Sequence, residues 1–161
     1  MKDGVIVQIG TPEEILSNPA NEYVRKFVQG VNRSKVLTAS SIMRDTDTVI
    51  TVTGGARLAL RQMREAAISS VYVTDKQCRL LGLVTIDDVT QLIREGKDDL
   101  SGILEKEICT VGPDVLVEEI LPLFLKTKYP VAVVDSENTL LGLIFKVSAL
   151  AGIVGEGNGN D

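Results

Sequence analysis

The 161-residue sequence contains no histidine and no tryptophan, and it contains only two cysteines. Without histidine, a Ser-His-Asp triad, a Cys-His dyad and the usual zinc enzyme site are all excluded. Cys78 and Cys109 are too few and too far apart to indicate the disulfide scaffold of a small secreted protein, which favours a reducing compartment. The composition therefore argues against the commonest hydrolytic and metal-dependent enzymes.

Long apolar runs and an excess of positive charge are also missing. No stretch reaches the ~18 apolar residues that would span a bilayer, and the N-terminus lacks a signal-peptide core. The 17 basic and 22 acidic side chains give a net charge of −5, which is unfavourable for binding nucleic acid. We therefore expect a cytoplasmic protein that neither enters a membrane nor binds nucleic acid.

The sequence does contain an ordinary globular balance, with 44% hydrophobic and 24% charged residues, and an internal repeat. Residues 71–75, VYVTD, have a counterpart in VAVVD at 131–135, and LLGLV at 80–84 has one in LLGLI at 140–144. Both pairs are 60 residues apart. A repeat at fixed spacing indicates two copies of one supersecondary unit.

Both copies predict the same order of elements: a short strand, a helix, two strands joined by a tight polar turn, and a closing helix. The expected ranges are 50–52, 55–66, 71–74, 80–84 and 87–95 in the first copy, and 109–111, 115–126, 131–134, 140–144 and 146–154 in the second. The strands are rich in Val, Leu and Ile, as in a buried sheet. Pro122 should strain or kink the helix over 115–126.

The first 40 residues follow a different pattern. Val5–Val7 predicts a short strand, and Thr11 followed by Pro12 and Glu14 predicts a helix that starts with a capping box. A second helix is expected over 21–28, ended by Gly30. Residues 31–40 are interpreted as a linker, and the glycine-rich residues 156–161 as a flexible tail.

The repeated β-α-β-β-α unit, with LLGLVTIDD at residues 80–88, resembles a tandem pair of CBS domains, or Bateman module. This resemblance implies an α+β fold with one CBS repeat over 41–97 and a second over 98–155. Residues 2–16, KDGVIVQIGTPEEIL, and 18–24, NPANEYV, resemble the C-terminal end of an ABC-transporter ATPase domain. Together, the two resemblances match the ATPase subunit of glycine betaine, carnitine, choline and proline importers, with residues 1–30 as the end of its ATPase domain.

The resemblance does not extend to catalysis. The chain has no Gly-x-x-x-x-Gly-Lys-Ser/Thr phosphate loop, so we expect no ATP hydrolysis from it, although the parent subunit would be an ABC-type ATPase. No metal or required cofactor is expected. The resemblance further implies a homodimer through the CBS helices, with 57–67 and 117–125 as candidate faces. A membrane-spanning importer subunit would be contacted through the missing ATPase domain, at the cytoplasmic face of the cell membrane.

CBS pairs of this type bind adenine nucleotides in clefts between repeats, so the resemblance implies AMP, ATP or cyclic di-AMP as a regulatory ligand. In the first repeat, Asp88 lies one turn into a helix and could accept hydrogen bonds from ribose hydroxyls, while Thr85 could contact ribose or phosphate. The alternative is that Thr85 caps the helix and that Asp87 and Asp88 only complement its dipole.

The second repeat departs from this motif, since Phe145 and Ser148 stand where the first repeat has Thr85 and Asp88. Either Phe145 stacks on a base and Lys146 meets a phosphate, or Phe145 packs in the core and Lys146 is solvated. The resemblance adds base-binding candidates on the strand that follows the first helix of each repeat: Ser70, Val71, Tyr72, Tyr129 and Pro130. Tyr129, Leu143 and Lys146 match the aromatic, aliphatic and basic positions that some of these importers use for cyclic di-AMP.

These features predict a regulatory module that controls transport through nucleotide binding or through ionic strength. Beyond residue 40, acidic side chains outnumber basic ones by 18 to 12, and salt screens such charges over about 8 Å. The alternative is a structural dimerisation module without a ligand. An enzyme has little support, because Asp87 and Asp88 point to different faces of a helix and make a poor acid-base pair.

Overall fold

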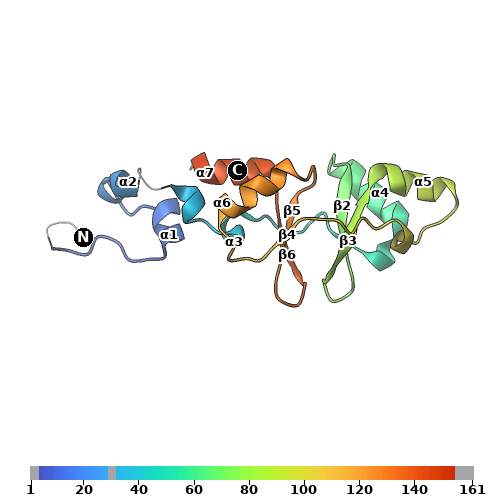
Figure 1. Cartoon of the computed structure of the whole chain (residues 1–161), viewed down its shortest axis with the longest axis horizontal. Coiled ribbons are helices and arrows are strands. Elements are labelled where there is room, and N and C mark those ends of the chain that lie inside the picture. Colours follow the sequence, from blue (N-terminus) through green and yellow to red (C-terminus); the bar gives the residue numbers. More distant parts are fainter. Residues whose placement is uncertain (1–3, 29–31, 155–161) are drawn as a thin grey trace.

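The computed structural model describes residues 4–28 and 32–154, so that Gly30 and the predicted tail lie outside the described residues. The molecule is elongated, with the N-terminal helices at one end, the second repeat in the middle and the first repeat at the other end (Figure 1). The helices of both repeats lie on one side, and the two β-hairpins project on the other. The predicted tandem pair of α+β repeats is confirmed.

The first repeat contains a three-stranded sheet and two long helices. Its strands lie in the order β1-β2-β3, with β1 parallel to β2 and β2 antiparallel to β3. The elements are β1 (Ile50–Thr51), α4 (Gly55–Glu65), β2 (Ser70–Thr74), β3 (Leu80–Thr85) and α5 (Ile86–Arg94), with 3₁₀ turns at Val52–Gly54 and Leu100–Gly102.

The second repeat has the same sheet order, β4-β5-β6, but a shorter first helix. Its elements are β4 (Thr110–Val111), α6 (Val117–Ile120), β5 (Val131–Val134), β6 (Leu140–Ile144) and α7 (Lys146–Val154). The helix predicted over 115–126 is only partly correct, because α6 passes into a 3₁₀ segment, Leu121–Leu125. Pro122 is the physical reason: it has no N–H to donate and its ring crowds the preceding turn.

The N-terminal part contains α1 (Pro12–Ser17), α2 (Glu22–Val28), a 3₁₀ turn (Arg33–Lys35) and α3 (Ala39–Ile42). The capping box is confirmed, since Thr11 Oγ1 accepts the Glu14 N–H at 3.2 Å and Glu14 Oε2 accepts the Thr11 N–H at 2.9 Å. The strand predicted at Val5–Val7 is wrong. Val5 makes a single bridge, and a strand cannot persist without a hydrogen-bonded neighbour along its length.

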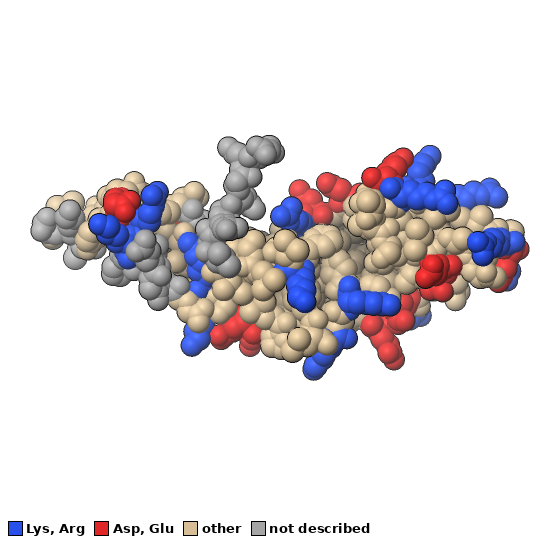
Figure 2. All heavy atoms as spheres, turned by 90° about the horizontal axis from the view of Figure 1, so that it is seen from above, with Lys and Arg blue, Asp and Glu red and all other residues tan. Residues whose placement is uncertain are grey.

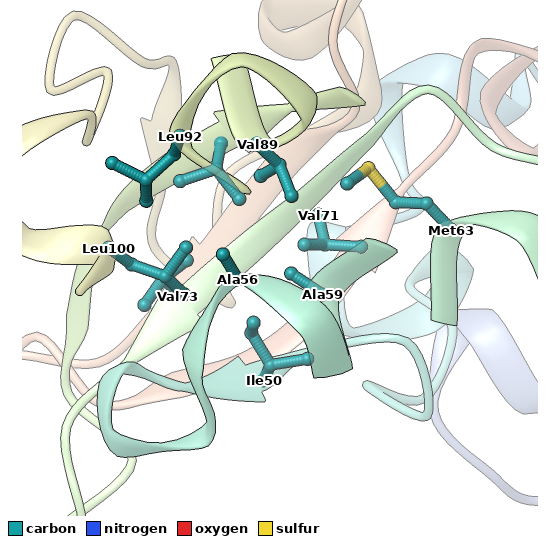
Figure 3. Packing of buried hydrophobic residues seen from close by; sticks show 10 residues of the cluster. Ile50, Ala56, Ala59, Met63, Val71, Val73, Val89, Leu92 and Leu100 are labelled. Atoms are coloured by element: carbon teal, nitrogen blue, oxygen red, sulfur yellow. The ribbon is translucent and has the colours of Figure 1, made fainter. Parts of the chain in front are cut away.

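The core of the first repeat lies between its sheet and the helices α4 and α5. Figure 3 shows side chains of all these elements pointing toward one another. Its buried members are Ile50, Ala56, Ala59, Met63, Val71, Val73, Val84, Val89, Leu92 and Leu100. The two alanines of α4, both 0% exposed, let that helix approach the sheet closely, so the core is filled mainly by branched residues of the strands and α5.

Residues 37–44, which precede the first repeat, complete the second one. Ala39 is fully buried in the second repeat's core, and Arg44 exchanges two backbone hydrogen bonds with Leu143 of β6, at 2.8 and 3.0 Å. Glu105 does the same with Leu83 of β3, at 2.9 and 2.7 Å. The end of the segment interpreted as a linker is thus packed against the second repeat.

These crossing segments explain the glycine in each Leu-Leu-Gly-Leu motif. A Cβ on Gly82 would lie 2.7 Å from the carbonyl oxygen of Glu105. A Cβ on Gly142 would lie 2.9 Å from the carbonyl oxygen of Arg44 and 2.7 Å from the sulfur of Met43. Both repeats therefore need a residue without a side chain where a neighbouring backbone crosses the strand.

The two sheets meet in a small core made of residues related by the repeat: Tyr72 and Ala132, Leu80 and Leu140, Leu83 and Leu143. Backbone bonds follow the same symmetry, because the Leu80 N–H donates to the carbonyl of Asn138 and the Leu140 N–H to that of Cys78, both at 2.9 Å. The Tyr72 hydroxyl donates to the carbonyl of Pro130. Burial raises the pKa of Tyr72 well above its usual value, so the hydroxyl stays protonated as a donor.

We expect Gly82→Ala and Gly142→Ala each to lower the free energy of unfolding by about 1–3 kcal/mol, because the crossing backbone must move to admit a methyl group. Gly112→Ala is the matched control, since nothing lies within 4 Å of a Cβ there. Urea denaturation of the three variants checks this. Equal stability of Gly82→Ala and Gly112→Ala would show that the crossing segment does not constrain the strand.

Candidate functional site

A cavity of about 460 Å³ lies between the two repeats and has walls from both. We call it the inter-repeat cavity. It is lined by Thr48, Ala67, Ile68, Ser69, Ser70, Val71 and Tyr72 of the first repeat and by Lys128, Pro130, Leu143 and Phe145 of the second. Its volume is within the range of sites that hold small organic ligands.

Three hydroxyls and one ammonium group of the inter-repeat cavity are free to bind a ligand. The side-chain hydroxyls of Thr48, Ser69 and Ser70 make no hydrogen bond to any residue within 4–28 or 32–154. The Lys128 ammonium lies 5.4 Å from the centroid of the Tyr129 ring and has no carboxylate partner among the described residues. No Asp or Glu lines this cavity. It therefore offers hydroxyls and a positive charge, but no negative charge.

The remaining wall of the inter-repeat cavity is apolar and partly aromatic. Ile68 and Phe145 are half-buried and supply most of its aliphatic and aromatic surface, whereas Tyr72 and Leu143 are almost fully buried behind it. Rings favour flat partners through stacked or edge-on contacts. The cavity is therefore complementary to a ligand that joins a flat, largely apolar part to an anionic part.

The loop between α4 and β2 is held in place by hydrogen bonds at both sides. After α4 ends, Ala67 takes a left-handed conformation with φ +54°, which turns the chain back toward the sheet. The Ile68 N–H donates to the Met63 carbonyl at 2.9 Å, and the Ser69 carbonyl accepts the Ile86 N–H at 2.8 Å. The hydroxyls of Ser69 and Ser70 are thus placed by a fixed backbone.

Five of the predicted ligand residues line the inter-repeat cavity, and Thr85 lies beside one of them as the cross-strand partner of Ser70. Ser70, Val71, Tyr72, Pro130 and Leu143 all line the inter-repeat cavity. The remaining four predicted residues do not: Thr85, Asp88, Tyr129 and Lys146. The resemblance gave Thr85 and Asp88 as ribose contacts of the first repeat, and Tyr129 and Lys146 as separate contacts of a cyclic dinucleotide.

Thr85 and Asp88 form the N-terminal cap of α5. Thr85 Oγ1 accepts the Asp88 N–H at 3.3 Å and donates to Asp88 Oδ2 at 2.9 Å. This is the geometry of the alternative that the sequence left open, a helix cap. Lys146 is the exposed first residue of α7.

The position equivalent to Asp88 in the second repeat has a different chemistry. Ser148 is buried, with 9% exposure, and its Oγ accepts a hydrogen bond from Arg44 Nε at 3.0 Å. Phe145 lines the inter-repeat cavity and borders the core between the sheets. A guanidinium thus lies beside the start of α7, where the first repeat has a carboxylate.

Thr48 and Ile68 also line the inter-repeat cavity but were not among the predicted site residues. Ile68 lies two residues before the predicted strand position Ser70. Thr48 precedes β1 and reaches the cavity only because β1 pairs with β2, with Ile50 opposite Val73. No local motif marks it, so only the strand pairing reveals it.

A second cavity, of about 510 Å³, is the counterpart of the first in the other repeat, and we call it the Tyr129 cavity. It is lined by Glu105, Glu107, Cys109, Leu125, Lys126, Thr127, Lys128 and Tyr129. The repeat offset places Glu107 where the first repeat has Thr48, and Tyr129 where it has Ser69. The two cavities are therefore equivalent in position but differ in charge.

Other classes of site receive no support from the residues that the structure describes. Within them, no group of three or more His, Cys, Asp or Glu side chains could hold a metal ion. No described helix combines the length and apolar character needed to cross a membrane. Cys78 is exposed and Cys109 half-buried, and both are free.

Comparisons with known sequences agree with the repeat architecture. The CBS domain family matches residues 39–95 and 100–154. The glycine betaine/carnitine transport ATP-binding protein GbuA of Listeria monocytogenes is 42% identical over 155 residues, covering 96% of this chain and 39% of the relative. The glycine betaine transport ATP-binding protein OpuAA of Bacillus subtilis is 45% identical over 155 residues, covering 94% and 37%. The chain thus spans well under half the length of these relatives.

Solved structures show the same fold. Staphylococcus aureus OpuCA superposes with a TM-score of 0.60 at 27% identity, over 68% of this chain and 92% of that one. CBSX2 in complex with AMP superposes with a TM-score of 0.62 at 19% identity, over 73% and 96%. From its two matched repeats and this shared architecture, the chain belongs to the CBS domain family, as a tandem CBS pair.

Proposed function

We propose that this CBS pair is the regulatory module of the ATPase subunit of an ABC importer for osmoprotectants such as glycine betaine, carnitine, choline or proline. The similarity to GbuA and OpuAA over almost the whole chain supports this origin. ATP hydrolysis would belong to a further part of the longer protein, which would also contact the membrane-spanning subunit at the cytoplasmic face of the membrane. Residues 1–30 would connect that part to the CBS pair.

The signal we propose is an adenine nucleotide, AMP, ATP or cyclic di-AMP, bound in the inter-repeat cavity. One observation carries this proposal: the cavity combines three unpartnered hydroxyls, the Lys128 ammonium and the half-buried ring of Phe145, without any carboxylate. A base would lie against the apolar wall and a phosphate near Lys128. CBS pairs of the same fold hold AMP in CBSX2, and 5′-methylthioadenosine and S-adenosyl-L-methionine in MJ0100.

The charge around α7 favours ligands with more than one phosphate. Arg44 donates a hydrogen bond to Ser148 near the start of α7, and Lys146 is the exposed first residue of this helix. The first turn of α7 contains no acidic side chain. Helix N-termini attract anions, and two cations beside one strengthen this attraction. Tyr129, Leu143 and Lys146 remain the proposed aromatic, aliphatic and basic contacts of a cyclic dinucleotide that extends beyond the inter-repeat cavity.

Regulation requires that the nucleotide bind one arrangement of the repeats better than another. The inter-repeat cavity satisfies the structural condition for this, because its walls come from Ser70–Tyr72 on one repeat and from Leu143 and Phe145 on the other. A ligand that contacts both walls stabilises one relative position of the two sheets. The N-terminal segment would transmit that position to the ATPase domain, since Arg44 is bonded directly to β6.

We expect Thr48→Glu to weaken binding of ATP and cyclic di-AMP by about tenfold or more, because a carboxylate within the cavity repels phosphate at short range. Gln77→Glu is the matched control, since it adds the same charge in the exposed turn between β2 and β3. Titration calorimetry of the three proteins checks this. Failure of the unmodified chain to bind AMP, ATP and cyclic di-AMP would contradict the proposal and favour ionic-strength sensing or a ligand-free structural module.

Asp88→Ala tests the ribose-binding role that the CBS resemblance implies. The hydrogen-bonded pair with Thr85 leads us to expect nucleotide affinity within about twofold of the unmodified chain, and a loss of about 1 kcal/mol in the free energy of unfolding from the weakened cap. Calorimetry and urea denaturation measure the two quantities. A fall in affinity of one to two powers of ten would instead place the ribose at Asp88.

We also propose a homodimer through the CBS helices. On α7, Val147 is 75% and Leu150 49% exposed, and no charged residue follows Lys146 on this helix. Exposed apolar side chains on a helix face are typical of a contact surface. Charged side chains of both signs crowd the helix side over α4 and α5 (Figure 2), so salt would alter contacts made there, which is how ionic strength could act.

We expect Val147→Asp to increase the dissociation constant of the dimer by about tenfold, because it buries a charge in an apolar contact. Lys76→Asp, in the exposed β2–β3 turn, is the control. Sedimentation at several protein concentrations measures both. A monomeric unmodified chain, or equal dissociation constants for the two variants, would exclude α7 from the interface.

A further inference from the structure

We propose that the Tyr129 cavity is a second ligand site and that it takes a small zwitterion, with an ammonium or quaternary ammonium group at one end and a carboxylate at the other. This proposal does not rest on nucleotide binding, although Tyr129 is also a proposed contact of a cyclic dinucleotide. It rests on the charges that line the cavity and on the surroundings of the Tyr129 ring.

Four charged side chains line one cavity without pairing with each other. Glu105 and Glu107 supply two carboxylates, and Lys126 and Lys128 supply two ammonium groups. Among the described residues, none of the four makes an ion pair. The one recorded hydrogen bond to these carboxylates is local, from the Glu107 N–H to Glu105 Oε1 at 2.8 Å. Opposite charges placed around a hollow without contact are complementary to a ligand that carries both signs.

The Tyr129 ring marks where the cationic end of the ligand would lie. Lys128 Nζ lies 5.4 Å from the centroid of this ring, so the ring face already attracts a cation. Tyr129 is half-buried, and its N–H is held by Thr127 Oγ1 at 3.1 Å, which fixes the strand start beside the cavity. A quaternary ammonium group on the ring, near Glu105 and Glu107, would make cation–π and charge contacts together.

The anionic end of the ligand would face Lys126 and Lys128. These two ammonium groups balance the two carboxylates, so the lining of the cavity is neutral overall. A simple cation therefore binds less favourably here than it would beside two carboxylates alone. Glu107, at the position that Thr48 holds in the inter-repeat cavity, disfavours a phosphate ligand through like-charge repulsion. The site therefore selects a ligand with both charges over a ligand with either one.

Lys128 lines both cavities and so connects them. If the Lys128 ammonium holds the ligand's carboxylate in the Tyr129 cavity, less of its positive charge is left for an anion in the inter-repeat cavity. Zwitterion binding is therefore expected to weaken the binding of an anion in the other cavity, and the coupling must be reciprocal.

Titration of the whole chain with glycine betaine, followed by amide chemical shifts, tests the site. Local shifts are needed because glycine betaine stabilises proteins in general by exclusion from their surface, which a thermal assay would also report. Two analogues are the ligand controls: choline lacks the carboxylate, and 3,3-dimethylbutanoate has carbon in place of the cationic nitrogen. We expect saturable shifts around Thr127–Tyr129 with glycine betaine, and binding at least about threefold weaker for both analogues.

Variants locate the effect within the cavity. We expect Tyr129→Leu and Glu107→Gln each to weaken glycine betaine binding by about threefold to tenfold, and Tyr129→Phe to retain it, because the ring face is kept. Glu137→Gln, in the exposed β5–β6 turn, is the charge-matched control and should bind like the unmodified chain.

Absence of saturable shifts, or equal affinity for glycine betaine and 3,3-dimethylbutanoate, would overturn the proposal. Equal affinities of Glu107→Gln and Glu137→Gln would do so as well. The nucleotide proposal is tested separately by Thr48→Glu in the other cavity, so that either one can fail while the other holds.

Discussion

The contact between the two repeats is the constraint on which the rest of the molecule depends. Tyr72, Leu83 and Leu143 are nearly fully buried there, and each sheet is extended at its edge by a segment that comes from outside its own repeat. Arg44 bonds to β6 and Glu105 to β3. A separate second repeat would lack the buried Ala39 of its own core, so this core is complete only when the segment before β1 is present.

The repeat also relates the two cavities, although only the inter-repeat cavity has walls from both repeats. Each one lies where the loop after a repeat's first helix enters the sheet, and the repeat relates Thr48 to Glu107 and Ser69 to Tyr129. The inter-repeat cavity thereby has hydroxyls and a positive charge. The Tyr129 cavity has carboxylates and an aromatic ring instead. The same scaffold can thus present two different binding chemistries, because function depends on the residues placed on the fold and not on the fold itself.

Sequence patterns predicted the fold well where the signal was periodic or repeated. The repeat indicated the order of strands and helices. Pro122, which was expected to strain or kink the helix over 115–126, stands where α6 passes into a 3₁₀ segment. The short helix α3 was missed, because its four residues contain too little periodicity to stand out from a linker. Val5–Val7 was wrongly predicted as a strand, because β-branched composition indicates strand propensity but cannot supply a neighbouring strand.

The candidate site was only half predictable for a related reason. Ser70, Val71, Tyr72, Pro130 and Leu143 were found through the family resemblance, and they share the inter-repeat cavity. Thr48 was missed, because its place depends on strand pairing between distant segments. Thr85 and Asp88 illustrate a deeper limit: a helix cap and a ribose-binding motif need the same residue types at the same spacing. The hydrogen bonds between Thr85 and Asp88 fit both roles, so a binding measurement has to separate them.

The central claim is that an adenine nucleotide occupies the inter-repeat cavity and contacts both repeats. The most direct test is a titration of isotopically labelled chain with cyclic di-AMP, and separately with ATP, monitored by amide chemical shifts. Our account predicts saturable shifts at Thr48, at Ser69–Tyr72 and at Leu143–Phe145, on the two opposing walls of the cavity. Shifts confined to one repeat, or no saturable shifts with either nucleotide, would contradict it.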